Sequence, residues 1–370
     1  CAVRLRIDGV LHTVYTMPQT VMAAVTARIK LLARLDVVER RRPLDGRIKT
    51  RSPRGGEVEM RISTLPTAFG EKLVMRIFDP ETTVKPVAEL GFDAGDAGRW
   101  QQLMGESHGI ILVTGPTGSG KTTTLYASLK RLATEAVNVC TIEDPIEMVE
   151  PAFNQTQVQP GLELGFAEGL RALMRQDPDI IMVGEIRDLE TAEMAVQAAL
   201  TGHLVFSTLH TNDAASAITR LIDLGVPAYL INATVIGVLA QRLVRSLCPD
   251  CKAPDADLTP AVLAQALPGL GALQDGLASL PLQACRAVGC ETCRGTGYRG
   301  RIGLFELLMV DETIRQANAS GAGQTPDLQA IRRQALAGGL RPLRLAGIER
   351  VAQGQTTLDE VLRATPSWQT

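Results

Sequence analysis

Aromatic side chains are scarce in this sequence of 370 residues, at 4% of the total. Proteins that bind single-stranded nucleic acid usually stack bases on aromatic rings within a strongly basic groove. The net charge is only −2, so composition argues against a nucleic-acid-binding protein. The charge is unevenly spread, because residues 1–78 carry 15 Lys and Arg against 7 Asp and Glu. This surplus predicts either a solvated basic face or arginines that contact phosphate.

The sequence also lacks a long apolar run. A helix that spans a membrane needs about 18 or more such residues. The best candidate, residues 226–243, is interrupted by Pro227, Asn232, Thr234 and Gln241. No signal-peptide pattern is visible. The chain starts with a cysteine and enters a strand-like pattern at once, so we expect further sequence upstream of it.

Residues 1–78 are predicted to form a small α+β domain. The stretch AVRLRIDGVLHTVY is typical of a hairpin that turns at Asp8-Gly9. A helix is expected from about Thr20 to Leu35, followed by two strands in EVEMRISTLPTAFGEKLVMRIF. Residues 79–90 contain two prolines and are the predicted linker.

Short apolar strands alternate with helical stretches in residues 91–247, which is typical of a parallel α/β sheet. We expect strands at residues 110–114, 137–142, 179–183 and 203–208. Asp188 and Gly202 are the predicted N-cap and end of the helix between the last two strands.

The C-terminal third divides into a cysteine-rich part, residues 248–303, and a part predicted to be helical, residues 304–370. The cysteine-rich part carries a Leu/Gly-rich insertion at 267–281, interpreted as a surface loop or short helices. Thr357 and Glu360 have the spacing of a capping box at the start of a helix.

The pattern G-x-x-x-x-G-K-T lies between a buried strand and an amphipathic helix, which is the context of a phosphate-binding loop. Glycines let the loop wrap a phosphate, with backbone N–H groups and the helix N-terminus directed at it. Lys121 is expected to reach the β- and γ-phosphates and Thr122 to contact Mg²⁺. The predicted nucleotide-binding residues are Gly115, Pro116, Thr117, Gly118, Ser119, Gly120, Lys121, Thr122 and Thr123.

Polar clusters follow three other apolar strands: Glu143-Asp144, Glu185 and His210. In a parallel sheet these clusters meet at the edge where the phosphate loop lies. Any one of them alone would indicate a structural ion pair or a helix cap. Together they predict the groups that hydrolysis of a nucleoside triphosphate needs. His203 is the weaker histidine candidate, and we expect it to be a hydrogen-bonded structural residue.

The motifs RIDGVL, GPTGSGKTTTLYA, TIEDPIE, LMRQDPDIIMVGEIRD, ETAEMAVQAALTGH and STLHTNDA together resemble the ATPases of type II secretion and type IV pilus assembly. The resemblance covers nearly the whole chain. It implies a RecA-like P-loop ATPase domain preceded by a small PAS-like α+β domain, with a tetracysteine zinc module and C-terminal helices. It also implies a cytoplasmic homohexamer, peripheral to the inner membrane, that docks on inner-membrane platform proteins.

The resemblance assigns roles to the acids and the histidine. Glu185 would hold the Mg²⁺ shell through water, Glu143 would be the base that polarises the attacking water, and His210 would contact the γ-phosphate. Arginines of the N-terminal domain would reach the nucleotide, some across a subunit boundary. Arg6, Arg61 and Arg76 occupy the matching strand motifs, and alternation should place them on one face. Plain surface charge is the alternative. Arg171, Arg175 and Arg187 are further basic candidates within the ATPase domain.

Two C-x₂-C pairs, Cys248/Cys251 and Cys290/Cys293, are separated by 38 residues. Four thiolates suit a closed, structural Zn²⁺ site, with disulfides or free thiols as the alternatives. Cys285 could compete as a ligand, whereas Cys140 lies in a predicted strand and is expected in the core.

The expected function is therefore an ATP-hydrolysing motor with ATP, Mg²⁺ and Zn²⁺ as cofactors. It would power pseudopilus assembly and type II secretion, with type IV pilus extension as the alternative. A retraction motor is disfavoured because the tetracysteine module belongs to the assembly branch of the resemblance. A nucleic-acid translocase, or a nucleotide-gated scaffold that barely turns over, is a weaker alternative.

Overall fold

A computed structural model describes residues 1–52, 55–78, 85–268, 270, 281–319 and 327–367 of the protein. The chain divides into two compact units. One comprises Cys1–Thr83 with Glu147–Val149, and the other comprises Val84–Ile146 with Glu150–Thr370. Of the predicted linker, residues 79–84 lie outside the described residues, and Val87–Glu89 forms a short 3₁₀ helix, η1.

The N-terminal unit begins with a hairpin of β1 (Ala2–Ile7) and β2 (Val10–Thr16). Asp8 and Gly9 form the turn with φ values of 49° and 84°. Positive φ at both central residues is what a tight I′ turn requires, and Asp-Gly tolerates it. The hairpin predicted at this dipeptide is confirmed.

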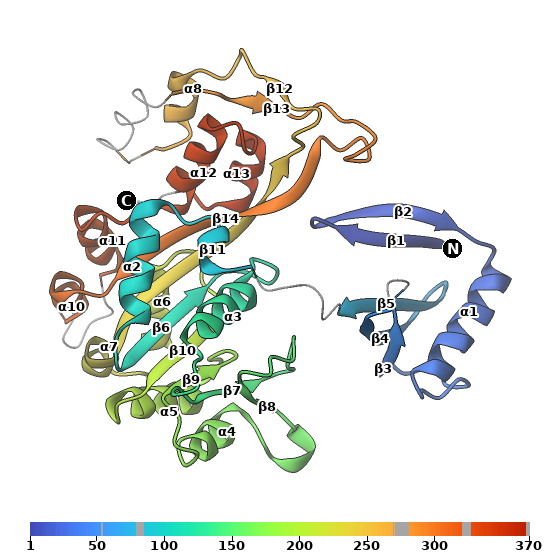
Figure 1. Cartoon of the computed structure of the whole chain (residues 1–370), viewed down its shortest axis with the longest axis horizontal. Coiled ribbons are helices and arrows are strands. Elements are labelled where there is room, and N and C mark those ends of the chain that lie inside the picture. The colour runs from blue at the N-terminus through green and yellow to red at the C-terminus, as the bar shows by residue number, and fades with distance from the viewer. Residues whose placement is uncertain (53–54, 79–84, 269, 271–280, 320–326, 368–370) are drawn as a thin grey trace. The chain divides into compact units, whose positions relative to one another are not determined.

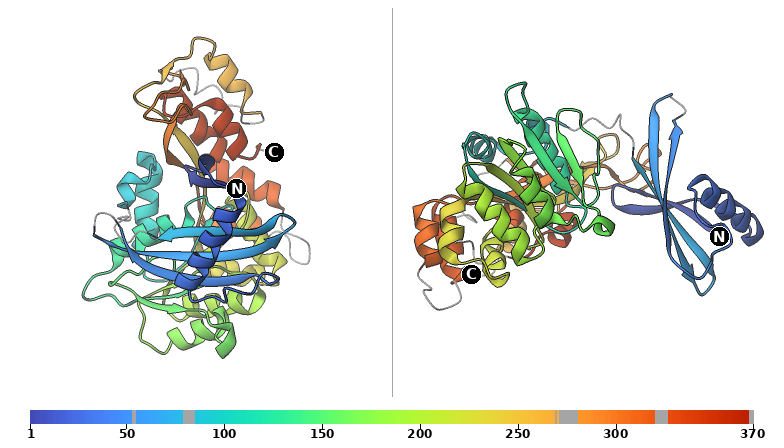
Figure 2. Two further views of the ribbon diagram at one scale, coloured as in Figure 1. Left: turned by 90° about the vertical axis from the view of Figure 1, so that its right-hand side faces the viewer. Right: turned by 90° about the horizontal axis from the view of Figure 1, so that it is seen from below.

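A separate three-stranded antiparallel sheet follows, in the order β3-β4-β5. Helix α1 lies across one face of this sheet (Figure 2). Ala33, at the end of α1, packs there with Ile48 and Ile62 of the sheet. Strand β3 was not predicted, because LDGRIKTR contributes only one buried side chain. The bounds are α1 (Gln19–Leu32), β3 (Leu44–Arg51), β4 (Glu57–Thr67) and β5 (Gly70–Phe78).

The second unit is built on a seven-stranded sheet in the order β14-β11-β6-β10-β9-β7-β8 (Figure 1). All neighbouring pairs are parallel except β11 with β14. The four strands predicted for this region are confirmed to within about two residues, the usual uncertainty of element ends. The bounds are β6 (Gly109–Thr114), β7 (Val139–Glu143), β8 (Asn154–Gln157), β9 (Ile180–Val183), β10 (Leu204–Leu209), β11 (Val235–Leu247) and β14 (Tyr298–Met309).

The direction of each crossover decides which face its helix covers, because parallel crossovers are right-handed. Helix α3 connects β6 to β7, which lies on one side of β6 in the sheet. The later connections, through α4, α5 and the pair α6–α7, each lead in the opposite direction across the sheet, towards β11. Helix α3 therefore covers one face and the other four cover the opposite face. The bounds are α2 (Ala94–Met104), α3 (Lys121–Leu132), η2 (Pro160–Leu162), α4 (Phe166–Leu173), α5 (Leu189–Leu200), α6 (Ala215–Asp223) and α7 (Ala228–Thr234).

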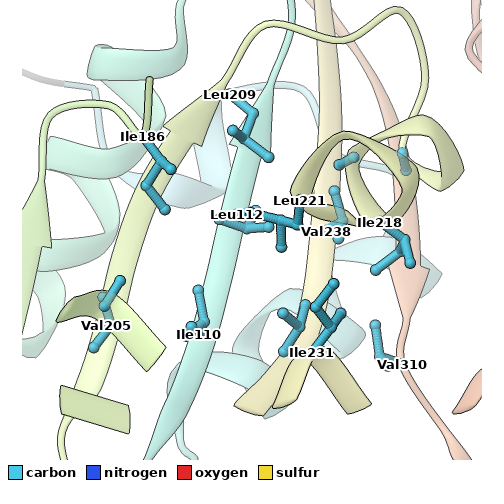
Figure 3. Packing of buried hydrophobic residues seen from close by; sticks show 14 of the residues in the cluster. Ile110, Leu112, Ile186, Val205, Leu209, Ile218, Leu221, Ile231, Val238 and Val310 are labelled. Carbon is cyan, nitrogen blue, oxygen red and sulfur yellow. The ribbon is translucent and has the colours of Figure 1, made fainter. Parts of the chain in front are cut away.

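Close packing on the face covered by α4 to α7 holds the central strands of the sheet in place. Ile110 and Leu112 of β6 lie beside Val238 of β11, under Leu221 of α6 and Ile231 of α7 (Figure 3). All five side chains are buried. Burying one such side chain contributes roughly 1.5–3 kcal/mol. This core holds the carboxyl ends of β6 and β10 together. The connections that leave these two neighbouring strands cross the sheet in opposite directions, and ligands bind at such a point in folds of this kind.

Residues 304–309 are strand rather than helix, so the prediction of a helical segment from 304 onwards is wrong there. They belong to β14, which pairs with β11 along its whole length. Residues 302–309 of β14, IGLFELLM, are apolar apart from Glu306, and such a run does not reveal whether a strand or a helix will form. The helices described after β14 are α10 (Glu312–Ala319), α11 (Leu328–Ala337), α12 (Leu343–Ala352) and α13 (Leu358–Ala364).

The cysteine-rich part contains a two-stranded ribbon of β12 (Ala253–Pro254) and β13 (Cys285–Arg286), with α8 (Pro260–Gln265) between them. Most of the predicted insertion, namely residues 269 and 271–280, lies outside the described residues. None of the helices in the described part of the chain combines the length and apolarity that a membrane span requires.

Candidate functional site

The phosphate loop lies between β6 and α3, as predicted. Gly115, Gly118 and Gly120 have positive φ values of 149°, 81° and 89°, which residues other than glycine rarely adopt. A Cβ on Gly115 would lie 2.5 Å from the Gln241 carbonyl, so neighbouring strand β11 approaches the loop closely. Ser119 Oγ is buried without a hydrogen-bond partner among the described residues. These features fit a cradle for phosphate.

Lys121 is the first residue of α3, and its ammonium group turns back over the loop. Lys121 Nζ donates to the carbonyls of Gly115 at 2.8 Å and Pro116 at 3.2 Å. Partial burial lowers the pKa of Lys121, and the charge of Glu185 opposes that effect. The lysine is therefore placed beside the loop and within electrostatic reach of Glu185.

Glu185, His210 and Arg187 form a cluster beside Lys121. Glu185 Oε2 lies 3.6 Å from His210 Nε2, and Glu185 Oε1 accepts a hydrogen bond from Arg187. Arg187 also lies 3.8 Å from Asp144. Burial and the charge of Lys121 lower the pKa of His210, and Glu185 opposes this. The structure thus brings together Lys121, Glu185 and His210, which the sequence had placed after three different strands.

Glu143 lies in a separate, buried network. Its carboxylate accepts hydrogen bonds from Tyr126 at 2.6 Å, Thr141 at 2.6 Å and Gln155 at 3.0 Å. A carboxylate has about four acceptor positions, so three donors leave one free. Among the described residues, no hydrogen bond or ion pair joins Glu143 directly to Glu185 or His210. Sequence reasoning missed Tyr126 and Gln155, because hydroxyl and amide groups carry no motif of their own.

Several weaker candidates are structural. His203 Nδ1 lies 2.9 Å from the Ala198 carbonyl, which confirms the expected hydrogen-bonded role. Arg171 pairs with Glu190 at 3.3 Å, and Arg175 donates to the Arg171 carbonyl. Of the three basic candidates in this unit, Arg187 is the one that contacts Glu185 among the interactions of the described residues.

The N-terminal unit carries its arginines in a row. Arg61 lies opposite Arg76 on the neighbouring strand, and Arg47 lies opposite Arg61 on the other side. Like charges directly opposite each other destabilise a sheet. Glu147 offsets this repulsion, because its carboxylate lies 4.0 Å from Arg61 and 3.7 Å from Arg76. The guanidinium of Arg61 also lies 4.5 Å from the ring centroid of Phe78.

Arg6 is not part of this row. It lies in the separate β1–β2 hairpin, where its guanidinium donates to the Gly9 carbonyl at 2.7 Å. The expectation that Arg6 shares a face with Arg61 and Arg76 is therefore wrong. Alternation places residues on one face only within a single sheet, and the hairpin does not pair with β3–β5.

The four cysteines of the two C-x₂-C pairs converge. Their sulfur atoms lie within 4.8 Å of one another, with Sγ–Sγ distances of 3.9 Å, 3.8 Å and 3.7 Å for three pairs. Tetrahedral zinc with bonds of about 2.3 Å would separate its sulfur ligands by ~3.8 Å. Backbone N–H groups of Cys290 and Gly297 donate to Cys293 Sγ, as is usual around a metal thiolate. The donor set therefore fits Zn²⁺.

The other cysteines lie outside this cluster. Cys285 Sγ donates to the Gln283 carbonyl at 3.4 Å, and it is not among the four converging sulfur atoms. Cys140 is buried in β7, which confirms its predicted place in the core.

Two buried charged residues near the phosphate loop were not predicted from the sequence. Arg242 of β11 and Glu306 of β14 are both nearly fully buried. The available signal was a lone charged residue inside an apolar run, as in IGLFELLM, because such a charge requires a partner. Burial first and the charge of Asp213 second raise the pKa of Glu306 to about 7, against opposing effects of the Ala214 and Leu343 amides and Arg242.

Replacing Glu306 should change how stability depends on pH. With a folded-state pKa raised from 4.5 to about 7, the native protein binds more protons than the unfolded chain between these values. The free energy of unfolding contributed by this group therefore falls as pH rises through that window. Relative to Glu306→Gln, the wild-type protein should lose stability between about pH 5 and pH 7. Urea unfolding of both proteins across this range measures it, and parallel curves would contradict the assignment.

The family model described as "Type II/IV secretion system protein" matches residues 1–363. The type IV pilus assembly ATPase TfpB of Acinetobacter baylyi is 60% identical over 365 residues, which are 98% of this chain and 60% of that protein. The type II secretion system ATPase E of Vibrio cholerae is 47% identical, over 98% of this chain and 69% of that protein.

The crystal structure of the pilus retraction motor PilT with bound ADP is similar in fold, with a TM-score of 0.64 and 25% identity. The match covers 98% of this chain and 90% of that one. The chain thus spans about three fifths to two thirds of the length of the two secretion and pilus relatives above.

Proposed function

The chain belongs to the family of type II/IV secretion system proteins, and from that premise we propose that it is the motor ATPase of a type II secretion system. It would hydrolyse ATP to ADP and phosphate and use the free energy to drive pseudopilus assembly. The observation that carries the proposal is the convergence of Lys121, Glu185 and His210 at the phosphate loop. Extension of a type IV pilus is the alternative, favoured by the 60% identity to TfpB.

The residues divide the chemistry among them. Lys121 and the loop amides would bind the β- and γ-phosphates. Thr122 and Glu185 would hold Mg²⁺, which shields the charge of the phosphate oxygens when bound. His210 would contact the γ-phosphate. Burial and the charge of Lys121 lower the pKa of His210, which favours the neutral imidazole, and the neutral ring can donate one hydrogen bond.

Glu143 would accept the proton of the attacking water. Tyr126, Thr141 and Gln155 donate to its two oxygens and fix the carboxylate in one orientation. One acceptor position remains for a water, which is the requirement for a general base.

We place the domain boundaries at residues 1–78 for the arginine-bearing domain, 91–247 for the ATPase core and 248–303 for the zinc module, with mainly helical residues after 304. The protein would act as a homohexamer in the cytoplasm, docked on inner-membrane platform proteins. A ring supplies the neighbouring subunit that completes each site.

Mg²⁺-dependent phosphate release from ATP tests the proposed activity directly. The purified chain should release phosphate, and Lys121→Ala should not, because the lysine binds the phosphates that react. Release no greater than that of Lys121→Ala would refute the proposal. Strong stimulation by single-stranded nucleic acid would instead favour a translocase.

Arg76→Ala should lower turnover by about tenfold or more, because an arginine that stabilises the transferred phosphoryl group contributes at least that much. The arginine is 65% exposed in the isolated chain, so its removal should not unfold the N-terminal sheet. Steady-state hydrolysis at saturating ATP is the measurement. The control is Arg28→Ala, on the exposed side of α1. Equal activity of the two variants would show that Arg76 is plain surface charge.

A further inference from the structure

The loop that carries His210 is held from several sides. It connects β10 to α6 and comprises His210 to Ala214. At its start, the Thr211 amide donates to Thr114 Oγ1 at 2.8 Å, which ties the loop to the end of the phosphate-loop strand. His210 itself remains about half exposed, so the ring depends on the loop for its position.

Asp213 joins this loop to helix α11. Its Oδ2 accepts a hydrogen bond from Arg332 Nη2 at 2.6 Å, and its Oδ1 accepts from the Ser216 amide at 2.7 Å. The side chains of Asp213 and Arg332 are only 9% and 15% exposed. The ion pair is therefore largely shielded from solvent.

Glu306 joins the same loop to helix α12. One oxygen accepts from the Ala214 amide at 2.8 Å, and the other accepts from the Leu343 amide at 3.0 Å. Leu343 is the first residue of α12. A single buried carboxylate thus connects the end of the loop with the N-terminus of a C-terminal helix.

Arg242 fills the space between this loop and the phosphate loop. Its Nη2 donates to the Asn212 carbonyl at 2.7 Å, and its Nη1 would lie 2.9 Å from a Cβ on Gly115. The charges of Glu306 and Asp213 act on it from the other side. Three charged groups therefore surround the loop behind His210.

Buried ion pairs contribute little net stability, because the cost of desolvation offsets the attraction. Fully satisfied buried networks instead make one arrangement of the chain rigid. Here Asp213 is part of the loop between His210 and α6, and Glu306 and Arg242 each contact that loop.

We propose that Asp213 and Glu306 are positioning residues, which hold the His210 loop on helices α11 and α12 and thereby set the imidazole relative to Glu185 and the γ-phosphate. The inference rests on the proposed ATPase function and on the proposed role of His210. It also makes α11 and α12 the C-terminal helices that a change at the nucleotide would reach through this loop.

The test compares two similar ion pairs. Asp213→Asn removes the charge facing Arg332 but keeps an oxygen for the Ser216 amide. The matched control is Glu360→Gln, because Glu360 is 6% exposed, pairs with Arg245 at 2.7 Å and also with Arg363, and accepts from a backbone amide. Glu360 does not contact the His210 loop among the interactions of the described residues.

Asp213→Asn should lower kcat by about tenfold and change the KM for ATP by less than about threefold, because a displaced catalytic group slows chemistry more than binding. Glu360→Gln should lower the melting temperature to a similar extent and keep kcat within about twofold of wild type. Equal kcat for the two variants would overturn the proposal.

Two further variants keep the test decisive. If Asp213→Asn does not fold, Arg332→Lys replaces it, since lysine retains the charge but not the planar fork. Its kcat should still fall relative to that of Glu360→Gln, and an unchanged kcat would overturn the proposal. His210→Gln is measured in parallel. Loss of turnover in His210→Gln without loss in Asp213→Asn would refute only the positioning role. Wild-type turnover in His210→Gln would refute the proposed role of His210 itself.

Discussion

Glu143→Gln is expected to lower ATP turnover by about a hundredfold or more while leaving ATP binding unchanged, because general bases contribute 10²–10⁴ to rate. The substitution preserves the size of the side chain and keeps an oxygen for Tyr126 or Thr141. It removes the negative charge that would take the proton from water. Equilibrium binding of a fluorescent ATP analogue and steady-state phosphate release together measure the two effects.

The control for this variant is Glu150→Gln, in the segment that leads to β8. Glu150 pairs with Lys130 at 2.9 Å, away from the phosphate loop, so turnover should stay within about twofold of wild type. Turnover of Glu143→Gln within about tenfold of wild type would reject Glu143 as the base. Asp144, which lies 3.8 Å from Arg187, would then be the next carboxylate to replace.

Cys293→Ser should abolish stoichiometric zinc binding and lower the stability of the protein sharply. The free energy of zinc binding to such sites, about 10–16 kcal/mol in small domains, acts as folding free energy. Cys293 is buried and its sulfur accepts two backbone N–H groups, so serine leaves these donors poorly satisfied. Elemental analysis should find about one zinc per wild-type chain, and thermal unfolding should begin at a lower temperature in the variant.

The matched control is Cys285→Ser, which changes the neighbouring cysteine that does not join the four converging sulfur atoms. It should retain zinc and melt close to wild type. Freshly purified wild-type protein without zinc would show that the four cysteines do not hold this metal. Zinc loss in both variants would show that Cys285 is part of the site.

Structural features that depend on a few neighbouring residues could be predicted from the sequence. The Asp8-Gly9 turn, the phosphate loop and the convergence of four cysteines each depend on residues whose conformation or chemistry is specific. The clustering of Glu185 with His210 was also predictable, because the carboxyl ends of parallel strands meet at one edge of the sheet.

Features that depend on distant pairing could not be predicted. Strand β11 follows α7 without a glycine or proline between them, and its apolar run is equally compatible with a helix. The pairing of Glu306 with the amides of Ala214 and Leu343 joins residues far apart in the chain. Arg6 was misplaced for the same reason, since only the structure shows that its hairpin is a separate sheet.

In the proposed motor, each catalytic site is completed by a neighbouring subunit in a ring. ATP turnover per subunit, measured over about a hundredfold range of protein concentration with Mg²⁺ present, tests it most directly, because assembly depends on mass action. Specific activity should rise steeply with concentration, together with a shift to a larger species on a sizing column. An appreciable, concentration-independent rate from a chain that elutes as a monomer at the lowest concentration would contradict it.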